Sequence, residues 1–258
     1  MKVALAQMLV EGGEPEGNRD RASRRIEEAA GRGADLALLP EALDFGWTHP
    51  SARAGAGSVP GGETFELLSK AARKHGINVC AGLVERSGER LYNSAVLLGR
   101  DGELLARHRK INELEIAHDL YSLGTEAGAV CETEFGAVGL EICADGFADD
   151  QWISRQLCEL GAKLILSPCA WAVDADFDPT DEPYGKIWRE NLAPVARERG
   201  VWIIACSNVG PITEGPWRGR KCIGNSMVFD PDGNEVLTGP FGEDADELLL
   251  LEIGGKVF

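Results

Sequence analysis

The stretch Val138-Gly139-Leu140-Glu141-Ile142-Cys143 is an apolar run that ends in a thiol, and its surroundings indicate the fold class. It predicts a strand over Ala137–Ile142, followed by an amphipathic helix from about Ala148 to Leu160 and a second strand over Lys163–Leu166. Short apolar runs and amphipathic segments alternate in this way along most of the chain. Such alternation is typical of sheets covered by helices, so the sequence predicts an α/β protein.

Two short patterns outside this unit resemble each other and suggest two similar halves. Asn93–Glu103 and Asn225–Asn234 each predict a strand, an Asp-Gly turn and a second strand, which is a hairpin pattern. Two halves built on two sheets, with helices outside, would account for this. No linker-like run divides the chain, so residues 1–258 are expected to form a single domain. Further strands are predicted at Lys2–Met8, Ala34–Leu39, Asn78–Glu85, Ser94–Leu98, Glu103–Arg107, Val201–Ser207, Ser226–Phe229, Glu235–Leu237 and Glu247–Ile253, and helices at Asn18–Arg32, Glu63–His75 and Lys186–Arg199.

The composition argues against several classes of partner. The chain has 42 acidic and 26 basic residues, which gives a formal net charge of −16 and disfavours nucleic acid and anionic membranes as partners. No apolar run approaches the length of a membrane-spanning helix, and the short run Val3–Val10 predicts a strand, so we expect a cytoplasmic protein. Seven cysteines without a CxxC pair indicate neither a disulfide framework nor a zinc site.

Three chemically capable side chains follow predicted strands at the points where these strands end. Glu41 follows the strand that ends at Pro40, Lys110 follows the run Leu104–Arg109, and Cys143 follows Ile142. Catalytic groups often lie where strands run into loops, because the sheet fixes them and the loop admits substrate. Taken singly, each residue is more simply explained as a surface charge or an inert buried thiol.

Taken together and in order, these segments resemble the active-site sequences of the nitrilase superfamily, the carbon-nitrogen hydrolases. The matching pieces are Leu39-Pro40-Glu41, His108-Arg109-Lys110-Ile111 and Gly139-Leu140-Glu141-Ile142-Cys143-Ala144-Asp145, and the resemblance spans residues 2 to about 253. It implies a four-layer α-β-β-α sandwich of two mixed sheets flanked by helices. It also implies a homodimer or larger homo-oligomer.

The resemblance assigns a role to each of these residues. Cys143 would be the nucleophile, Glu41 would take and return its proton, and Lys110 with the backbone N–H of Ala144 would hold the oxyanion. A helix beginning soon after Cys143 would lower the pKa of the thiol further. No metal and no organic cofactor is expected.

The sequence departs from the family pattern at a second active-site glutamate and at a substrate-binding pair of arginines. His118 stands where many members carry that glutamate, so Glu113 or Glu115 could supply the role instead, or it could be missing. Relatives that cleave N-carbamoyl amino acids have arginines three and four residues after the cysteine, where this chain has Gly146 and Phe147. A clamped carboxylate is therefore not expected. Candidates for the substrate pocket are His118, Phe147, Cys169 and Trp171, for each of which a core or helix-end position is the simpler interpretation.

The function predicted from the sequence is cysteine-dependent hydrolysis of a C–N bond in a small non-peptide amide, through a thioester acyl-enzyme. Hydrolysis of a nitrile or an N-carbamoyl amine needs the same three residues and stays open. A non-catalytic scaffold of the same fold is an alternative of another class. A metal-dependent phosphoesterase is disfavoured, because the four histidines show no ligand-like spacing.

Overall fold

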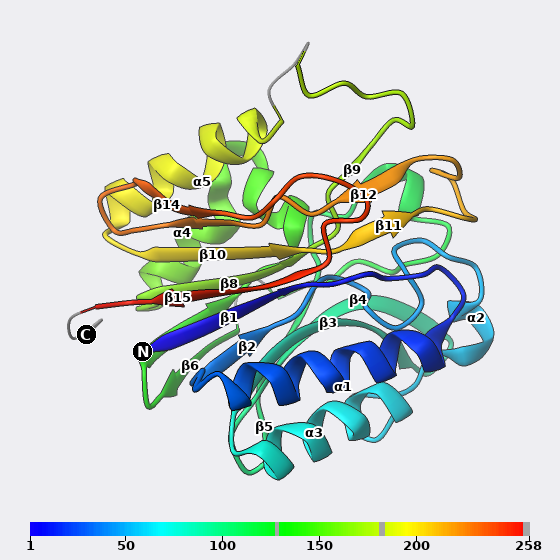
Figure 1. Cartoon of the computed structure of the whole chain (residues 1–258), viewed down its shortest axis with the longest axis horizontal. Coiled ribbons are helices and arrows are strands. Elements are labelled where there is room, and N and C mark those ends of the chain that lie inside the picture. The colour runs from blue at the N-terminus through cyan, green and yellow to red at the C-terminus, as the bar shows by residue number, and fades with distance from the viewer. Residues whose placement is uncertain (127–128, 181–183, 255–258) are drawn as a thin grey trace.

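The computed structural model describes residues 1–126, 129–180 and 184–254. Two six-stranded sheets lie face to face with helices on both outer sides (Figure 1). The first sheet has the order β15 (Glu247–Glu252), β1 (Lys2–Gln7), β2 (Leu36–Leu38), β3 (Asn78–Ser87), β4 (Arg90–Leu98) and β5 (Leu104–Arg109). The second has the order β14 (Glu235–Thr238), β13 (Met227–Phe229), β10 (Trp202–Ser207), β8 (Leu164–Cys169), β7 (Gly136–Leu140) and β6 (Ala129–Thr133).

Both sheets are mixed, with parallel strands in the middle and antiparallel strands at the edges. β1, β2 and β3 run parallel in the first sheet, as do β7, β8 and β10 in the second. Helices α1 (Pro15–Gly31) and α3 (Glu63–His75) cover the first sheet, and α4 (Trp152–Glu159) and α5 (Lys186–Arg199) cover the second (Figure 1). The predicted α-β-β-α sandwich is confirmed.

Each sheet contributes apolar side chains to two cores, one between the two sheets and one between the sheet and its helices. In β1, Val3 and Leu5 face the other sheet and pack with residues such as Leu140 and Ile204. The intervening residues, such as Ala4, pack beneath the helices instead. Successive side chains of a strand point to opposite faces, so one short apolar run can supply both layers.

The structure differs from the predicted elements around the nucleophile. The helix expected from about Ala148 begins only at Trp152, after two 3₁₀ turns, η2 (Cys143–Phe147) and η3 (Asp149–Gln151). Asp150 and Gln151 both adopt left-handed φ angles, of 54° and 47°, and this interrupts a continuous helix. The expected helix N-terminus beside Cys143 is therefore wrong.

A third sheet and several short elements were not predicted. β9 (Ala172–Val173), β11 (Val209–Pro211) and β12 (Lys221–Ile223) form a small sheet, and α2 (Ala52–Gly55), η1 (Glu115–Ala117) and β6 are also additional. Segments of two to five residues carry no measurable hydrophobic period, so the sequence could not indicate them. No helix within the described ranges is long and apolar enough to cross a membrane.

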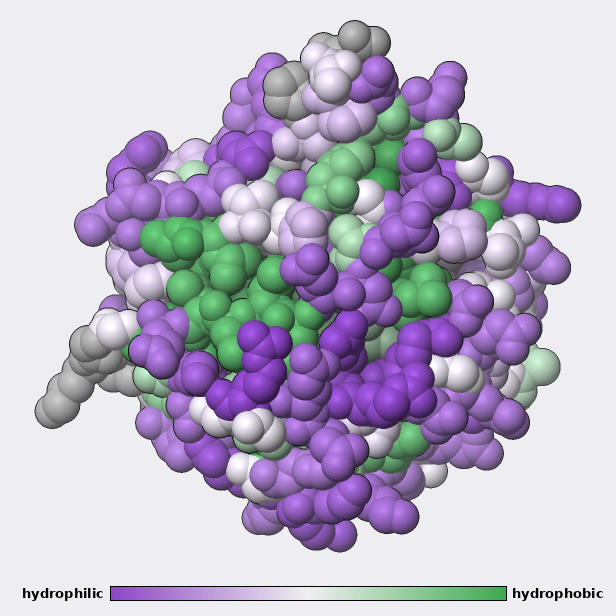
Figure 2. All heavy atoms as spheres, viewed as in Figure 1, coloured by the Kyte–Doolittle hydropathy of each residue, from purple (hydrophilic) through white to green (hydrophobic). Residues whose placement is uncertain are grey.

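Apolar side chains reach the surface at the side of the sandwich where β14 and β15 end the two sheets (Figure 2). Leu237 of β14 and Leu249 and Leu251 of β15 are partly exposed members of the core between the sheets. Trp152 and Leu160, at the ends of α4, are 43% and 53% exposed. The described surface thus carries exposed apolar groups at this side and at the ends of α4.

Candidate active site

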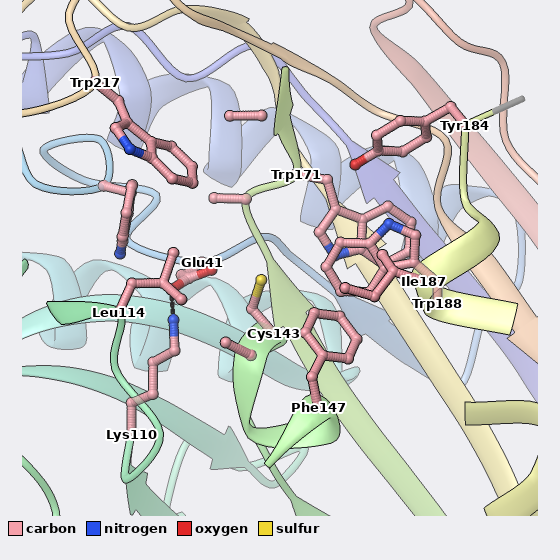
Figure 3. Close-up of a pocket in the computed structure, with 14 residues that line it drawn as sticks. Glu41, Lys110, Leu114, Cys143, Phe147, Trp171, Tyr184, Ile187, Trp188 and Trp217 are labelled. Carbon is pink, nitrogen blue, oxygen red and sulfur yellow. Dashed lines mark hydrogen bonds and ion pairs between the residues drawn. The ribbon is translucent and has the colours of Figure 1, made fainter. Parts of the chain in front are cut away.

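Glu41, Lys110 and Cys143 meet in one cavity, although each comes from a different strand end. Glu41 lies three residues after β2, Lys110 directly follows β5, and Cys143 opens η2 after β7. Figure 3 shows the three side chains pointing toward one another from both sheets. All three line a cavity of about 250 Å³. The predicted convergence is therefore what the structure shows.

Backbone contacts across the sandwich fix where these strand ends lie. The N–H of Glu41 donates to the carbonyl oxygen of Cys169 in β8, at 3.2 Å, and so ties the first sheet to the second. The N–H of Lys110 donates to the carbonyl oxygen of Asn93 in β4, at 2.8 Å. Gly82 of β3 lies against the backbone of Glu41, where a Cβ atom would stand 2.6 Å from the Cα of Glu41.

Gly82 gives the first testable prediction. Gly82→Ala must displace the backbone of Glu41, and a misplacement of about 1 Å at a catalytic group can cost about 100-fold in rate. We expect kcat of the Gly82→Ala variant to fall by about that factor. The control is Gly31→Ala, because a Cβ atom at Gly31 meets nothing within 4 Å. Wild-type kcat in the Gly82→Ala variant would contradict this placement of Glu41.

Lys110 lies between two buried carboxylates. Its Nζ is 2.7 Å from Oε1 of Glu41 and 3.1 Å from Oε1 of Glu113, and the side chains of both glutamates are 1% exposed. The Nδ2 of Asn93 donates to both, at 2.6 Å to Glu41 and 3.0 Å to Glu113. Trp47 adds an indole N–H to Glu113 at 3.3 Å. Glu113 is therefore the second carboxylate that contacts Lys110, although it does not line the cavity itself, and Glu115 is exposed.

The charges in this cluster follow from burial and proximity. Burial alone would lower the pKa of the Lys110 ammonium, but Glu113 and Glu41 raise this pKa well above its ordinary value, so Lys110 is a cation. Burial raises the pKa of Glu41, an effect that Lys110 opposes and Glu113 reinforces. A carboxyl group with a raised pKa is a stronger base than an ordinary glutamate and can still hold a transferred proton.

Cys143 has the opposite pKa shift from the one expected. Burial raises the pKa of its thiol well above the ordinary value, Cys169 and Glu41 add to this, and Lys110 opposes it. η2 is only a short 3₁₀ turn, and the α-helix whose N-terminus was expected to lower the pKa begins at Trp152. Cys143 therefore rests as a thiol and needs a base to become a nucleophile. The neighbouring Ala144, whose backbone N–H is the expected second oxyanion donor, lines the cavity.

The walls of the cavity are largely aromatic. Phe147 and Trp171 line it as predicted, together with Trp188, which stacks on Trp171 with ring centroids 3.9 Å apart. Among the described lining residues Lys110 is the one cation. The complete described lining consists of Glu41, Trp47, Lys110, Leu114, Cys143, Ala144, Phe147, Ala170, Trp171, Ala172, Tyr184, Ile187, Trp188 and Trp217.

Two of the predicted pocket residues lie elsewhere. Cys169 is 1% exposed and packs in the core behind the cavity, with its thiol 3.5 Å from the hydroxyl of Ser167. Cys169 is the last residue of β8, and the next residue, Ala170, lines the cavity instead. His118 is exposed, and its Nε2 lies 3.2 Å from the carbonyl oxygen of Glu113. Neither residue lines the described cavity, and the simpler interpretations, a core position for Cys169 and a helix-end position for His118, agree with the structure.

Asn93 is the residue of the cluster that was not singled out from the sequence. The register of the predicted hairpin could have indicated it. β4 and β5 form this hairpin around Asp101-Gly102, and Ser94 pairs with Arg109. The next position outward on each strand places Asn93 beside Lys110. Trp47 lies in an irregular loop and carried no comparable signal.

Comparisons with known proteins show the family of the chain. The carbon-nitrogen hydrolase family matches residues 2–255, and the chain belongs to that family. A nitrilase of Pyrococcus abyssi is 32% identical over 257 residues, which cover 98% of this chain and 89% of the relative. The chloroplastic omega-amidase of Arabidopsis thaliana is 28% identical over 93% of this chain and 62% of its own length.

Two solved structures share the fold. An amidase from Nesterenkonia sp. has a TM-score of 0.81 at 24% identity and covers 98% of this chain and 90% of its own. Nit3 of Saccharomyces cerevisiae has a TM-score of 0.83 at 23% identity, over 100% and 91% of the two chains. Family and fold together identify an enzyme that hydrolyses carbon–nitrogen bonds.

Proposed function

We propose that this enzyme hydrolyses small, uncharged, non-peptide amides through a thioester on Cys143. The observation that carries the proposal is the meeting of a thiol, a buried carboxylate and a buried ammonium in one cavity. Amide hydrolysis needs a nucleophile, a proton carrier and a stabiliser of negative charge, and these three side chains supply them.

The first half of the reaction forms the acyl-enzyme. Glu41 takes the thiol proton of Cys143, and the thiolate attacks the carbonyl carbon of the amide. The oxygen of the tetrahedral intermediate becomes an anion, which the Lys110 ammonium and the N–H of Ala144 stabilise. Glu41 then gives the proton to the nitrogen, the C–N bond breaks, and ammonia or an amine leaves a thioester on Cys143.

The second half hydrolyses this thioester. Glu41 takes a proton from water, and the hydroxide oxygen attacks the thioester carbon. The same two donors hold the second oxyanion. Its collapse breaks the C–S bond, releases the carboxylic acid, and returns the proton to the sulfur. Glu113 and Asn93 hold Lys110 and Glu41 in place throughout, and Glu113 keeps Lys110 charged.

The cavity supports an uncharged acyl group. Its walls are aromatic and aliphatic, and its one described cation already contacts both Glu41 and Glu113. A substrate carboxylate would enter this site without a partner, and an unpaired buried charge costs several kcal/mol. Phe147 occupies a position at which a carboxylate-binding relative would carry arginine.

Nitrile hydrolysis is the second candidate, and a specific observation favours it. The relative from Pyrococcus abyssi that matches 98% of this chain bears the name nitrilase. Attack of Cys143 on a nitrile carbon would use the same residues. Hydrolysis of an uncharged N-carbamoyl amine would use them too.

Selectivity among amides provides the second prediction. We expect kcat/KM for a neutral four- to six-carbon amide to exceed that for a matched ω-amide of a dicarboxylic acid by at least about 100-fold, because the cavity leaves the carboxylate unpaired. Ammonia release from both amides, a matched nitrile and an N-carbamoyl amine would be measured in parallel. Faster turnover of the charged amide would refute the proposed substrate class, and preference for the nitrile would favour the second candidate.

The homodimer or larger assembly expected from the family resemblance stays a proposal. Exposed apolar groups such as Trp152, Leu160 and Ile187 lie on or beside the helices of the second sheet and give such an interface a basis. Light scattering coupled to size-exclusion chromatography measures the mass directly. A mass of one chain at micromolar concentration would contradict the proposal.

A further inference from the structure

A second buried pair links the two segments that carry Lys110 and Cys143. Nε2 of His108 lies 2.7 Å from Oδ2 of Asp145, and the two side chains are 1% and 0% exposed. His108 precedes Lys110 by two residues, and Asp145 follows Cys143 by two residues. Neither side chain lines the described cavity, so neither contacts the reacting atoms.

Asp145 contacts the backbone on both sides of the active site. Its Oδ1 accepts the N–H groups of Ile111 and Asn112, at 3.1 and 2.8 Å, and these residues directly follow Lys110. Its Oδ2 accepts the N–H of Ile142, at 3.0 Å, which directly precedes Cys143. One carboxylate group therefore holds the lysine segment and the nucleophile turn together.

The nucleophile turn needs such support. Cys143 has a φ of 47°, in the left-handed region that a residue with a side chain rarely adopts. Conformations of this kind persist only where surrounding contacts hold them. The N–H of Asp145 donates to the carbonyl oxygen of Ile142, at 2.9 Å, so Asp145 closes the turn through its backbone and its side chain.

The contacts also keep Asp145 ionised. Burial alone would raise the pKa of this carboxyl group, but the hydrogen bond and charge of His108, with the N–H of Asn112, bring the pKa below its ordinary value. A carboxylate accepts hydrogen bonds through both oxygens, as four N–H groups require here. An amide group of the same shape offers one acceptor oxygen only.

We propose that Asp145, oriented by His108, is a positioning residue that sets the place of the Lys110 ammonium relative to the Cys143 sulfur. The inference rests on the proposed function, because it assumes that the distance between the Lys110 ammonium and the Cys143 sulfur controls the reaction. The alternative is that the pair stabilises the fold and leaves the chemistry of the folded molecules unchanged.

The test compares Asp145→Asn with two variants of His108. In Asp145→Asn, one pair of N–H donors loses its acceptor, so kcat is expected to fall about 100-fold while KM changes by less than about threefold. His108→Gln keeps an N–H donor, whereas His108→Phe removes it. We expect His108→Phe to lose kcat about as strongly as Asp145→Asn, and His108→Gln to recover most of it.

Asp35→Asn is the matched control. Asp35 also accepts a backbone N–H, from Lys2 at 2.8 Å, but it lies at the opposite end of β2 from Glu41. The kcat of the Asp35→Asn variant is expected to equal that of the wild type. Thermal unfolding gives the folded fraction of every variant, to which kcat is normalised.

The alkylation rate of Cys143 by iodoacetamide supplies a readout without substrate. It is expected to fall in Asp145→Asn and His108→Phe and to recover in His108→Gln. Wild-type kcat and alkylation rate per folded molecule in Asp145→Asn would overturn the positioning role. If Asp145→Asn does not fold, equal kcat values and equal alkylation rates in His108→Phe and His108→Gln would overturn the positioning role. Turnover in Cys143→Ala would instead refute the proposed function. Failure of the positioning role and failure of the proposed function are therefore seen in different variants.

Discussion

Cys143→Ala is expected to lower ammonia release from a neutral amide by more than about 10⁴-fold, to the background rate. Alanine removes the sulfur that forms the thioester and leaves Glu41 and Lys110 without a nucleophile to activate. The substitution deletes one atom beside an open cavity, so the thermal midpoint should change little. Steady-state ammonia release and thermal unfolding measure the two effects.

Cys131→Ala provides the matched control for this substitution. Cys131 is half-buried in β6 and does not line the described cavity, so its variant should turn over as the wild type does. Iodoacetamide should label Cys143 faster than the other six thiols in the wild type, because Cys143 lies in an open cavity with Glu41, which can take its proton. Uniform slow labelling, with activity retained in Cys143→Ala, would contradict a nucleophilic role for Cys143.

Glu41→Gln is expected to reduce kcat by about 10²- to 10⁴-fold, because glutamine cannot take a proton from the thiol or from water. Gln keeps the size of the side chain and an oxygen for Lys110. The fold should therefore persist. The pre-steady-state rate of ammonia release and the rate of product formation show which half of the reaction slows.

The pH dependence of the wild type follows from the same residue. Glu41 must be ionised to act as the base, so activity falls as pH drops through its pKa. Burial raises this pKa above the ordinary value of 4.5, and the acidic limb of the kcat/KM profile should lie above pH 4.5. An acidic limb below that pH, or a Glu41→Gln variant with wild-type kcat, would contradict the assignment of Glu41.

The strand-end residues could be placed from the sequence because their signal is local. Glu41, Lys110 and Cys143 each follow an apolar run, and in this order their segments resemble those of the nitrilase superfamily, although the strands before them belong to two sheets. The alternation of apolar and amphipathic segments predicted an α/β protein, whereas the four-layer sandwich was implied by the family resemblance. What the sequence could not show is that Glu113, rather than Glu115, faces Lys110, because this depends on the path of an irregular loop.

The missed features depend on contacts between segments that are distant in sequence. The turn at Cys143 is held by contacts of Asp145 with Ile142 and with the segment after Lys110, which no local pattern in the sequence indicates. The pKa of Cys143 depends on burial, which no motif records. Cys169 ends a strand at an apolar run, yet it is Ala170, the first residue after this strand, that lines the cavity.

Intact-protein mass spectrometry during turnover tests the central claim most directly. The enzyme would be mixed with a saturating neutral amide, quenched in acid within milliseconds, and digested to locate any added mass. We predict an adduct with the mass of the acyl group on Cys143, which appears with a burst of ammonia and is absent from Cys143→Ala. Full turnover of the amide with no acyl group on Cys143 at any time, and equal turnover by Cys143→Ala, would contradict the account.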